Sequence, residues 1–239
     1  MRKRTAATLA AIAVILVSLP LLVSCATGRA SAFSDDDVNY TMHYVLEEAG
    51  EQTVSDLFMM LNRLTEPMVP EQYSVMVDMR NVIPGMNGIL NDWALQISTY
   101  VLGFYDSFRE YSGNLVRSQV FTDPQELLVS GSSSISLLMK ELHYDEVRRI
   151  IRGKMTSPDP TYWNEAVQQY NAWVITGSLL SGSSAQTISA PSDTEGVADM
   201  LAVHLADLYF RGLASAETLI RTTPDPQMDN LAAQVLGLI

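Results

Sequence analysis

The side chains best suited to catalysis in this 239-residue chain are three histidines and two serine-rich segments. His43, His143 and His204 are far apart in sequence, and none pairs with another at the spacing of a metal-binding motif. Neither serine-rich segment, 130–136 or 181–194, has the Gly-x-Ser-x-Gly turn that exposes a nucleophile after a strand. The sequence therefore indicates no catalytic residue, no metal and no cofactor, and it leaves a hydrolase as a third-ranked hypothesis.

Helical periodicity gives the individual histidines structural roles. His204 shares a stripe with Val197, Leu201, Leu205 and Leu208, which favours a core histidine over a catalytic base. His143 lies between two acidic residues near a helix end, which favours a surface capping role.

The acidic triplet 35–37 has two interpretations. Ser34 precedes it, which is typical of a helix N-cap followed by acidic residues in the first turn. A calcium site is the alternative, but the triplet lacks the loop glycine and the spaced oxygen ligands of such a site.

One basic cluster stands out in an acidic chain and consists of Arg148, Arg149, Arg152 and Lys154. Acidic residues lie within one or two helical turns of it, so salt bridging to Glu141, Asp145 and Glu146 is the favoured interpretation. The alternative is a patch that docks an anionic partner, such as a lipid headgroup or a cell-wall polymer.

Aromatic residues recur at helical spacing between residues 93 and 111. Core packing explains such a stripe in most proteins, but helical bundles also host apolar ligands. The residues that would line such a pocket are Trp93, Tyr100, Phe104 and Phe108.

The overall charge limits the classes of partner. The formal net charge is −12, and it becomes −15 when Arg2, Lys3 and Arg4 are removed with a leader. A surface of this sign repels the phosphate backbone, so we expect no nucleic acid partner. It also repels anionic lipids, so membrane attachment must be covalent or hydrophobic.

The first 24 residues have the features of a secretory signal: a basic start, an apolar run over 6–17 and a small residue before the only cysteine. The sequence Leu22-Val23-Ser24-Cys25 resembles the lipobox of bacterial lipoproteins. This resemblance implies a diacylglycerol thioether on Cys25, cleavage after Ser24 and acylation of the new amino terminus. Ala26 resembles the residue of lipoproteins exported to the outer membrane. An uncleaved transmembrane helix is the alternative, but its apolar run is only just long enough.

The mature chain reads as a series of amphipathic helices without sustained strand alternation. We predict residues 1–24 as signal peptide, 25–34 as lipidated N-terminus and flexible tether, and 35–239 as one orthogonally packed all-α domain. Gly50 is expected to end the first helix, and Gly113 to interrupt a central, strongly patterned one. The expected helical segments are 38–49, 54–64, 71–81, 91–111, 115–120, 127–129, 137–154, 162–173, 195–221 and 229–236.

Two segments carry a family resemblance. FTDPQELLVSGSSSISLLMKEL (121–142) and TLIRTTPDPQMDNLAAQVLG (218–237) resemble helix-and-turn segments of the secreted all-helical domain-of-unknown-function 4197 family. Compatible spacing begins at Val69-Pro70-Glu71, whereas Ser132, Ser133 and Ser134 replace residues that tend to be acidic in that family. The resemblance implies an all-α fold and an extracytoplasmic location, and it implies no activity.

These observations predict a membrane-anchored lipoprotein of the bacterial cell envelope, in the outer membrane and facing the periplasm. We expect its partners to be the bilayer, through acylated Cys25, and an envelope protein. A non-enzymatic scaffold or interaction module is the favoured function, and a helical carrier of a lipid or other apolar ligand is the alternative.

Overall fold

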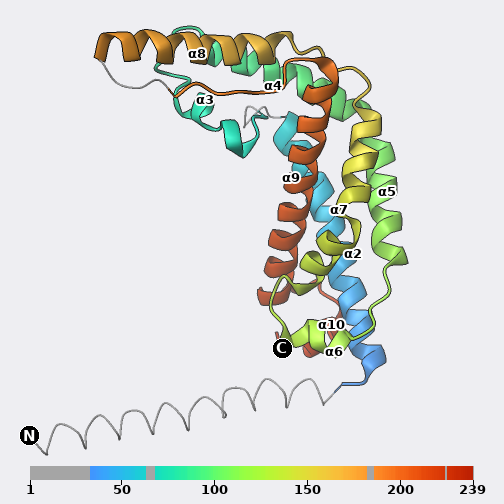
Figure 1. Cartoon of the computed structure of the whole chain (residues 1–239). Helices are drawn as coiled ribbons and strands as arrows, with labels where there is room; N and C mark the ends of the chain where they lie inside the picture. Colours follow the sequence, from blue (N-terminus) through green and yellow to red (C-terminus); the bar gives the residue numbers. More distant parts are fainter. Residues whose placement is uncertain (1–32, 63–67, 182–185, 224, 239) are drawn as a thin grey trace, which may run out of the picture.

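Four long helices run side by side along the body of the protein (Figure 1). They are α2 (Asp35–Asn62), α5 (Tyr105–Ser118), α7 (Ser134–Lys154) and α9 (Thr194–Thr222), and α9 packs against both α2 and α7. The computed structural model describes residues 33–62, 68–181, 186–223 and 225–238. Within these ranges all regular structure is helical, which confirms the predicted all-α class.

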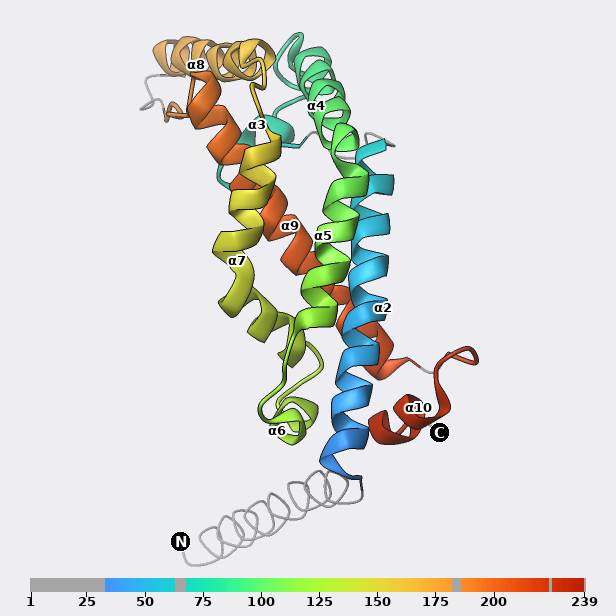
Figure 2. The ribbon, with the colours of Figure 1, turned by 90° about the vertical axis from the view of Figure 1, so that its right-hand side faces the viewer.

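Shorter elements close the two ends of this bundle (Figures 1 and 2). At one end, α4 (Met86–Gly103) and α8 (Thr161–Ser181) pack together across the bundle, beside a short 3-10 helix, η1 (Glu71–Tyr73), and α3 (Val75–Asp78). At the other end, α6 (Pro124–Val129) and α10 (Asn230–Leu236) pack against α2. The crossing layers make one orthogonally packed domain, as the sequence predicted.

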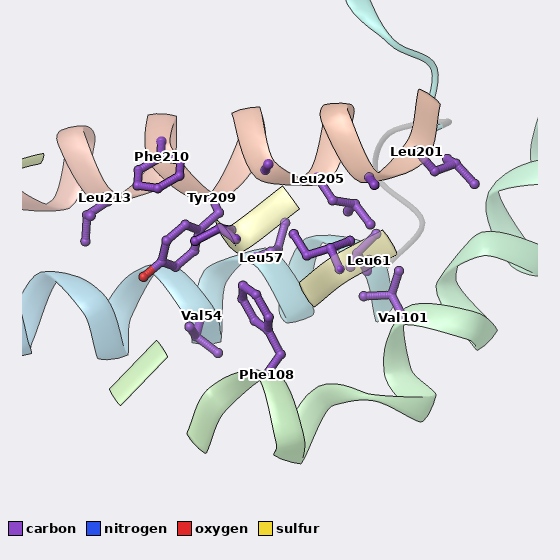
Figure 3. Close-up of a cluster of buried hydrophobic side chains, with 14 of the residues drawn as sticks. Val54, Leu57, Leu61, Val101, Phe108, Leu201, Leu205, Tyr209, Phe210 and Leu213 are labelled. Atoms are coloured by element: carbon purple, nitrogen blue, oxygen red, sulfur yellow. The ribbon is translucent and has the colours of Figure 1, made fainter. Parts of the chain in front are cut away.

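The core of the bundle forms where α2, α5 and α9 face one another (Figure 3). Apolar side chains at helical spacing on α2 and α9 meet Phe108 from α5. Tyr209 packs edge-on against Phe108 with ring centroids 5.4 Å apart, and its hydroxyl shares a 2.8 Å hydrogen bond with Ser112 Oγ. The one polar atom of this buried tyrosine is thus satisfied, so the ring can occupy the core at little cost.

Gly50 does not end the first helix, because α2 runs without interruption from Asp35 to Asn62. A Cβ atom built on Gly50 would lie 3.2 Å from Val116 Cγ2, closer than most real Cβ contacts. The glycine therefore allows α5 to approach α2 closely, and packing outweighs its weak helix propensity.

The predicted central helix over 91–111 is also wrong in its boundaries. It begins earlier, at Met86, and breaks at Phe104, whose backbone leaves the helical conformation. Helix α5 then continues through Gly113 to Ser118. The break allows α4 to pack on α8 while α5 packs on α2, and α9 rather than this segment lies at the centre. The predicted helix over 71–81 is reduced to η1 and α3.

Two predicted helix starts are confirmed by their caps. The backbone nitrogen of Asp37 donates to Ser34 Oγ (3.2 Å), and the backbone nitrogen of Ser34 donates to Asp37 Oδ2 (3.1 Å). Asp123 accepts from the backbone nitrogen of Glu126 (2.9 Å), with Pro124 in the first turn. Both arrangements satisfy amide groups that have no partner within their helices.

Candidate functional site

The candidate site is a concave region beside α9. It consists of two adjoining depressions of about 690 and 660 Å³, which we call the α9 groove. The two halves share Glu71, His204 and Arg211. Its lining extends on α9 from Gly196 to Leu219, about 35 Å at the helical rise of about 1.5 Å per residue.

Spacing on α9 places residues of the first half on one side of the helix, whereas Asp199 and Asp207 of the second half lie on an adjoining side. His204, Leu208, Arg211 and Ser215 follow one another at intervals of four, three and four residues, which is one helical stripe. Helix α2 forms the wall of the first half, with Leu57 and Met60 among its apolar residues. At Gly212, a built Cβ atom would lie only 2.8 Å from Thr53 Cγ2, so the glycine permits the close approach of α2 and α9 beside the groove.

A short segment, 68–73, separates the two halves of the groove and brings Glu71 to its middle. Trp93 Nε1 donates to the carbonyl oxygen of Met68 (3.1 Å), and Met68 itself adopts a positive φ of 44°. Tyr73 packs edge-on against Trp163, with ring centroids 5.2 Å apart. Two buried tryptophans therefore hold the segment that carries Glu71.

His204 is mostly buried in the floor of the groove. Its pKa is lowered to about 4, mainly by burial and also by the guanidinium of Arg211, whereas Asp207 opposes the shift. The ring is therefore neutral at pH 7. It makes no hydrogen bond to the described residues, so it differs from the satisfied core histidine that the sequence suggested. No serine or carboxylate of the described chain holds His204 in a catalytic relay, and no cluster there has the composition of a metal site.

Carboxylates outnumber cations around the groove. Asp56, Glu71, Asp199 and Asp207 line it, against Lys140 and Arg211. Lys140 forms a 3.3 Å ion pair with Asp207. The groove thus combines apolar lining residues with a rim that is acidic on balance.

Sequence reasoning did not find Glu71, Lys140, Asp207 or Arg211 as groove residues. Three elements bring them together, and no local spacing encodes that meeting. Only the stripe of α9 around His204 gave a signal, and that stripe was interpreted as core.

A second polar cluster, formed by Glu217 and Arg221, is almost completely buried at the other end of α9. The carboxylate of Glu217 accepts from the backbone nitrogens of Ile135 (3.1 Å) and Ser136 (2.7 Å) at the start of α7. It also forms a 2.8 Å ion pair with Arg221. The serine segment 130–136 does begin a helix, but the cap of α7 comes from α9 and not from Ser133.

The remaining donors of Arg221 are also used. Its guanidinium donates to Ser134 Oγ (2.8 Å) and to the carbonyl oxygens of Leu127 (3.2 Å) and Leu128 (2.8 Å). All of these bonds are internal, so the cluster joins α6, α7 and α9 and is not a candidate ligand site. Glu217 lies on the helical stripe of Phe210 and Leu213, and this was the available sign of its burial.

Of the four residues in the predicted basic patch, two form ion pairs with described residues and two do not. Arg148 forms a 3.5 Å ion pair with Asp145, as expected, whereas Arg152 pairs with Glu195 and Asp199 of α9, outside its own helix. Arg149 and Lys154 are exposed and form no ion pair with a described residue. Salt bridging thus accounts for half of the cluster.

The four residues of the predicted apolar pocket are used in packing or in hydrogen bonds between elements. Trp93 packs on Trp163 with centroids 5.5 Å apart, and the hydroxyl of Tyr100 donates to the carbonyl oxygen of Ser157 (2.8 Å). Phe104 and Phe108 pack edge-on against each other in the core. None of the four lines the α9 groove.

The other predicted residues have simple surroundings. His143 Nε2 lies 3.0 Å from Gln119 Oε1 and links α7 to the segment after α5. His43 stacks at an angle on Phe121, with ring centroids 4.9 Å apart. Residues 1–32, which include the predicted signal peptide (1–24) and the predicted lipidation site Cys25, lie outside the described residues. Within the described ranges, no helix is both long and apolar enough to cross a membrane.

Comparison with known proteins gives no relative: no family model, no curated protein and no solved structure matches the chain.

Proposed function

We propose that the protein is a lipoprotein of the bacterial cell envelope, in which acylated Cys25 tethers an all-helical interaction module to a membrane. The module uses the α9 groove to hold a segment of a partner protein. The lipobox-like sequence before Cys25 supports the anchor, and the resemblance to secreted all-helical domains supports the same location. The Ala26 that follows favours the outer membrane, facing the periplasm.

The shape of the groove is the observation that carries the binding role. A compact ligand is usually enclosed by most of its pocket, whereas the two halves of this groove adjoin at His204 and Arg211 and together line about 35 Å of α9. A helix or extended segment of a protein has the length to occupy both halves, with apolar anchors placed at helical or strand intervals. The carrier alternative has less support, because the aromatic side chains that it requires pack against one another or bond to backbone.

The charges of the rim indicate the composition of that segment. Asp56 and Glu71 form no ion pair with a described residue, and they line a groove whose carboxylates exceed its cations. The surrounding surface is acidic as well, with a net charge of −12 for the chain. Electrostatic complementarity therefore favours a partner segment that combines apolar residues with lysine or arginine.

The anchor is tested by cell fractionation of the Cys25→Ser variant. Two or three acyl chains hold a protein stably on a bilayer, so the wild type should remain in the membrane fraction and the variant should be released. Mass spectrometry of the wild-type amino terminus should find the acyl groups. Retention of Cys25→Ser on membranes, or an unmodified terminus, would refute the anchor.

The groove is tested by a photo-crosslinking amino acid placed at Ser215, which is exposed on its rim. The matched control carries the same amino acid at Asn87, an exposed position on α4 outside the groove. We expect the amino acid at position 215 to crosslink one partner protein in cells. The crosslinked peptide of that partner should contain basic residues. The charge reversal Glu71→Lys should weaken that adduct, whereas Glu126→Lys, an exposed site on α6, should not. Equal adducts from both positions, or an adduct insensitive to Glu71→Lys, would refute the groove as the binding site.

A further inference from the structure

The distal end of α8 exposes four apolar side chains. Trp173 and Ile175 are about half exposed, and Leu179 and Leu180 are 79% and 85% exposed. We call these four residues the α8 tip. At about 100° per residue they fall on two sides of the helix, one with Trp173 and Leu180 and the other with Ile175 and Leu179. No element of the described chain covers these four side chains.

Hydrogen bonds hold α8 to the body only as far as Asn171. Its side chain donates to the carbonyl oxygen of Ile188 (2.9 Å) and accepts from the backbone nitrogen of Ile188 (2.9 Å). Beyond Asn171, the side-chain hydrogen bonds of the described part of α8 remain within the helix. The last turns of α8 therefore project from the layer that it forms with α4 (Figure 1).

The chain segment that contains the tip is uncharged in an otherwise acidic protein. From Ala166 to Ser192 the chain contains no Asp, Glu, Lys, Arg or His. Two copies of a chain with a net charge of −12 repel each other over most orientations. They meet without like-charge repulsion only where both surfaces lack charge, and the α8 tip is such a surface.

The direction of α8 fits a contact between copies that share a membrane. Helix α8 lies across the bundle, at the end opposite the start of α2 (Figures 1 and 2). With Cys25 of the proposed function in a bilayer, the start of α2 lies nearest to the membrane. When the bundle stands upright on this end, helix α8 lies at the far end, parallel to the membrane plane, and its tip points sideways toward a neighbouring molecule.

We propose that the α8 tip is a self-association surface, through which two membrane-tethered copies form a dimer about a two-fold axis along the membrane normal. A two-fold contact brings the same patch of both copies together, and an uncharged apolar patch is complementary to itself. A lipid surface is a poorer occupant, because interfacial helices usually pair their apolar face with lysine and arginine, which the tip lacks. The orientation rests on the proposed anchor, whereas the contact itself does not.

The test is sedimentation velocity of the full mature protein in detergent, with wild type compared with Leu179→Lys/Leu180→Lys. Both positions are so exposed that lysine should leave the fold intact, which circular dichroism checks. The matched control is Val120→Lys/Leu137→Lys, which replaces apolar residues 75% and 61% exposed elsewhere on the surface. We expect a concentration-dependent dimer for wild type and control, and dimerisation at least about tenfold weaker for the tip variant.

Disulfide crosslinking in native membranes gives a second readout, because Cys25 is the only native cysteine. Leu180→Cys should yield a crosslinked dimer under oxidation, and Leu137→Cys should not. A wild type that is monomeric at all concentrations, or a dimer unaffected by the tip lysines, would overturn the proposal. The proposal would also be overturned if Leu180→Cys crosslinked only to a different protein. It would be overturned as well if the tip lysines weakened membrane binding and left the dimer intact, because the tip would then contact lipid. Release of Cys25→Ser from membranes tests the anchor separately. A failure of the proposed anchor can therefore be distinguished from a failure of the proposed dimer.

Discussion

His204 should make the stability of the protein depend on pH in a defined window. Its pKa is about 4 in the folded protein and 6.5 for the ordinary side chain. As the pH falls below 6.5, the unfolded chain binds a proton that the folded protein excludes, and so the free energy of unfolding decreases. One pKa unit corresponds to about 1.4 kcal/mol, which gives a loss of about 2 kcal/mol between pH 7 and pH 5 and about 3 kcal/mol by pH 4. These are upper values, because the groove admits water to part of the ring.

The assay is urea unfolding, followed by circular dichroism, of wild type and His204→Gln at a series of pH values from 4 to 7.5. Glutamine keeps a polar side chain but does not titrate, and the carboxylates common to both proteins cancel in the comparison. The difference between the two unfolding free energies should change by about 2 kcal/mol between pH 7 and pH 5. Arg211→Gln should reduce that change, because the guanidinium helps to lower the pKa of His204. Parallel pH profiles, or a His204 ring that titrates near 6.5 by NMR, would refute the reasoning.

Three further substitutions test the packing of the helices, with urea unfolding as the measurement. Glu217→Gln removes a buried charge that caps α7 and pairs with a buried cation, and it should destabilise the protein by about 3–5 kcal/mol; a loss below 1 kcal/mol would contradict this role. Gly212→Ala should cost about 1–3 kcal/mol because its Cβ atom would meet Thr53. The control Gly88→Ala, a helical glycine with open space around it, should be neutral or slightly stabilising, so equal effects at both glycines would argue against the clash. Arg152→Gln breaks two exposed ion pairs and should cost no more than about 1 kcal/mol; a larger cost, or one unaffected by added salt, would mean that these pairs are shielded from solvent.

The helices were predictable because their signals are local. The caps at Ser34 and Asp123 and the apolar stripes lie within one or two turns of the backbone that they stabilise. The predicted helix boundaries were wrong where packing against an element distant in sequence determined where a helix begins or ends. Gly50 remains helical because Val116 packs against it, and the break at Phe104 serves the different partners of α4 and α5.

The buried ion pair shows where sequence reasoning had partial information. The spacing of Glu217 and Arg221 predicts that they share a helix face, and their stripe is apolar. What the sequence does not contain is the cap of α7, because that contact joins residues about 80 positions apart. The same limit applies to Arg152, whose carboxylate partners lie on α9 rather than on its own helix.

The α9 groove was beyond local reasoning for a related physical cause. An apolar stripe with one histidine has the same pattern whether another helix covers it fully or a short segment crosses it in the middle. Here Trp93 and Trp163 hold the segment 68–73 across α9, and this segment covers only the part of the stripe near His204. The exposed parts on either side become the two halves of the groove. Trp93, which the aromatic stripe suggested as a pocket residue, thus does not line the groove, but its hydrogen bond to Met68 helps to position the segment that divides the groove.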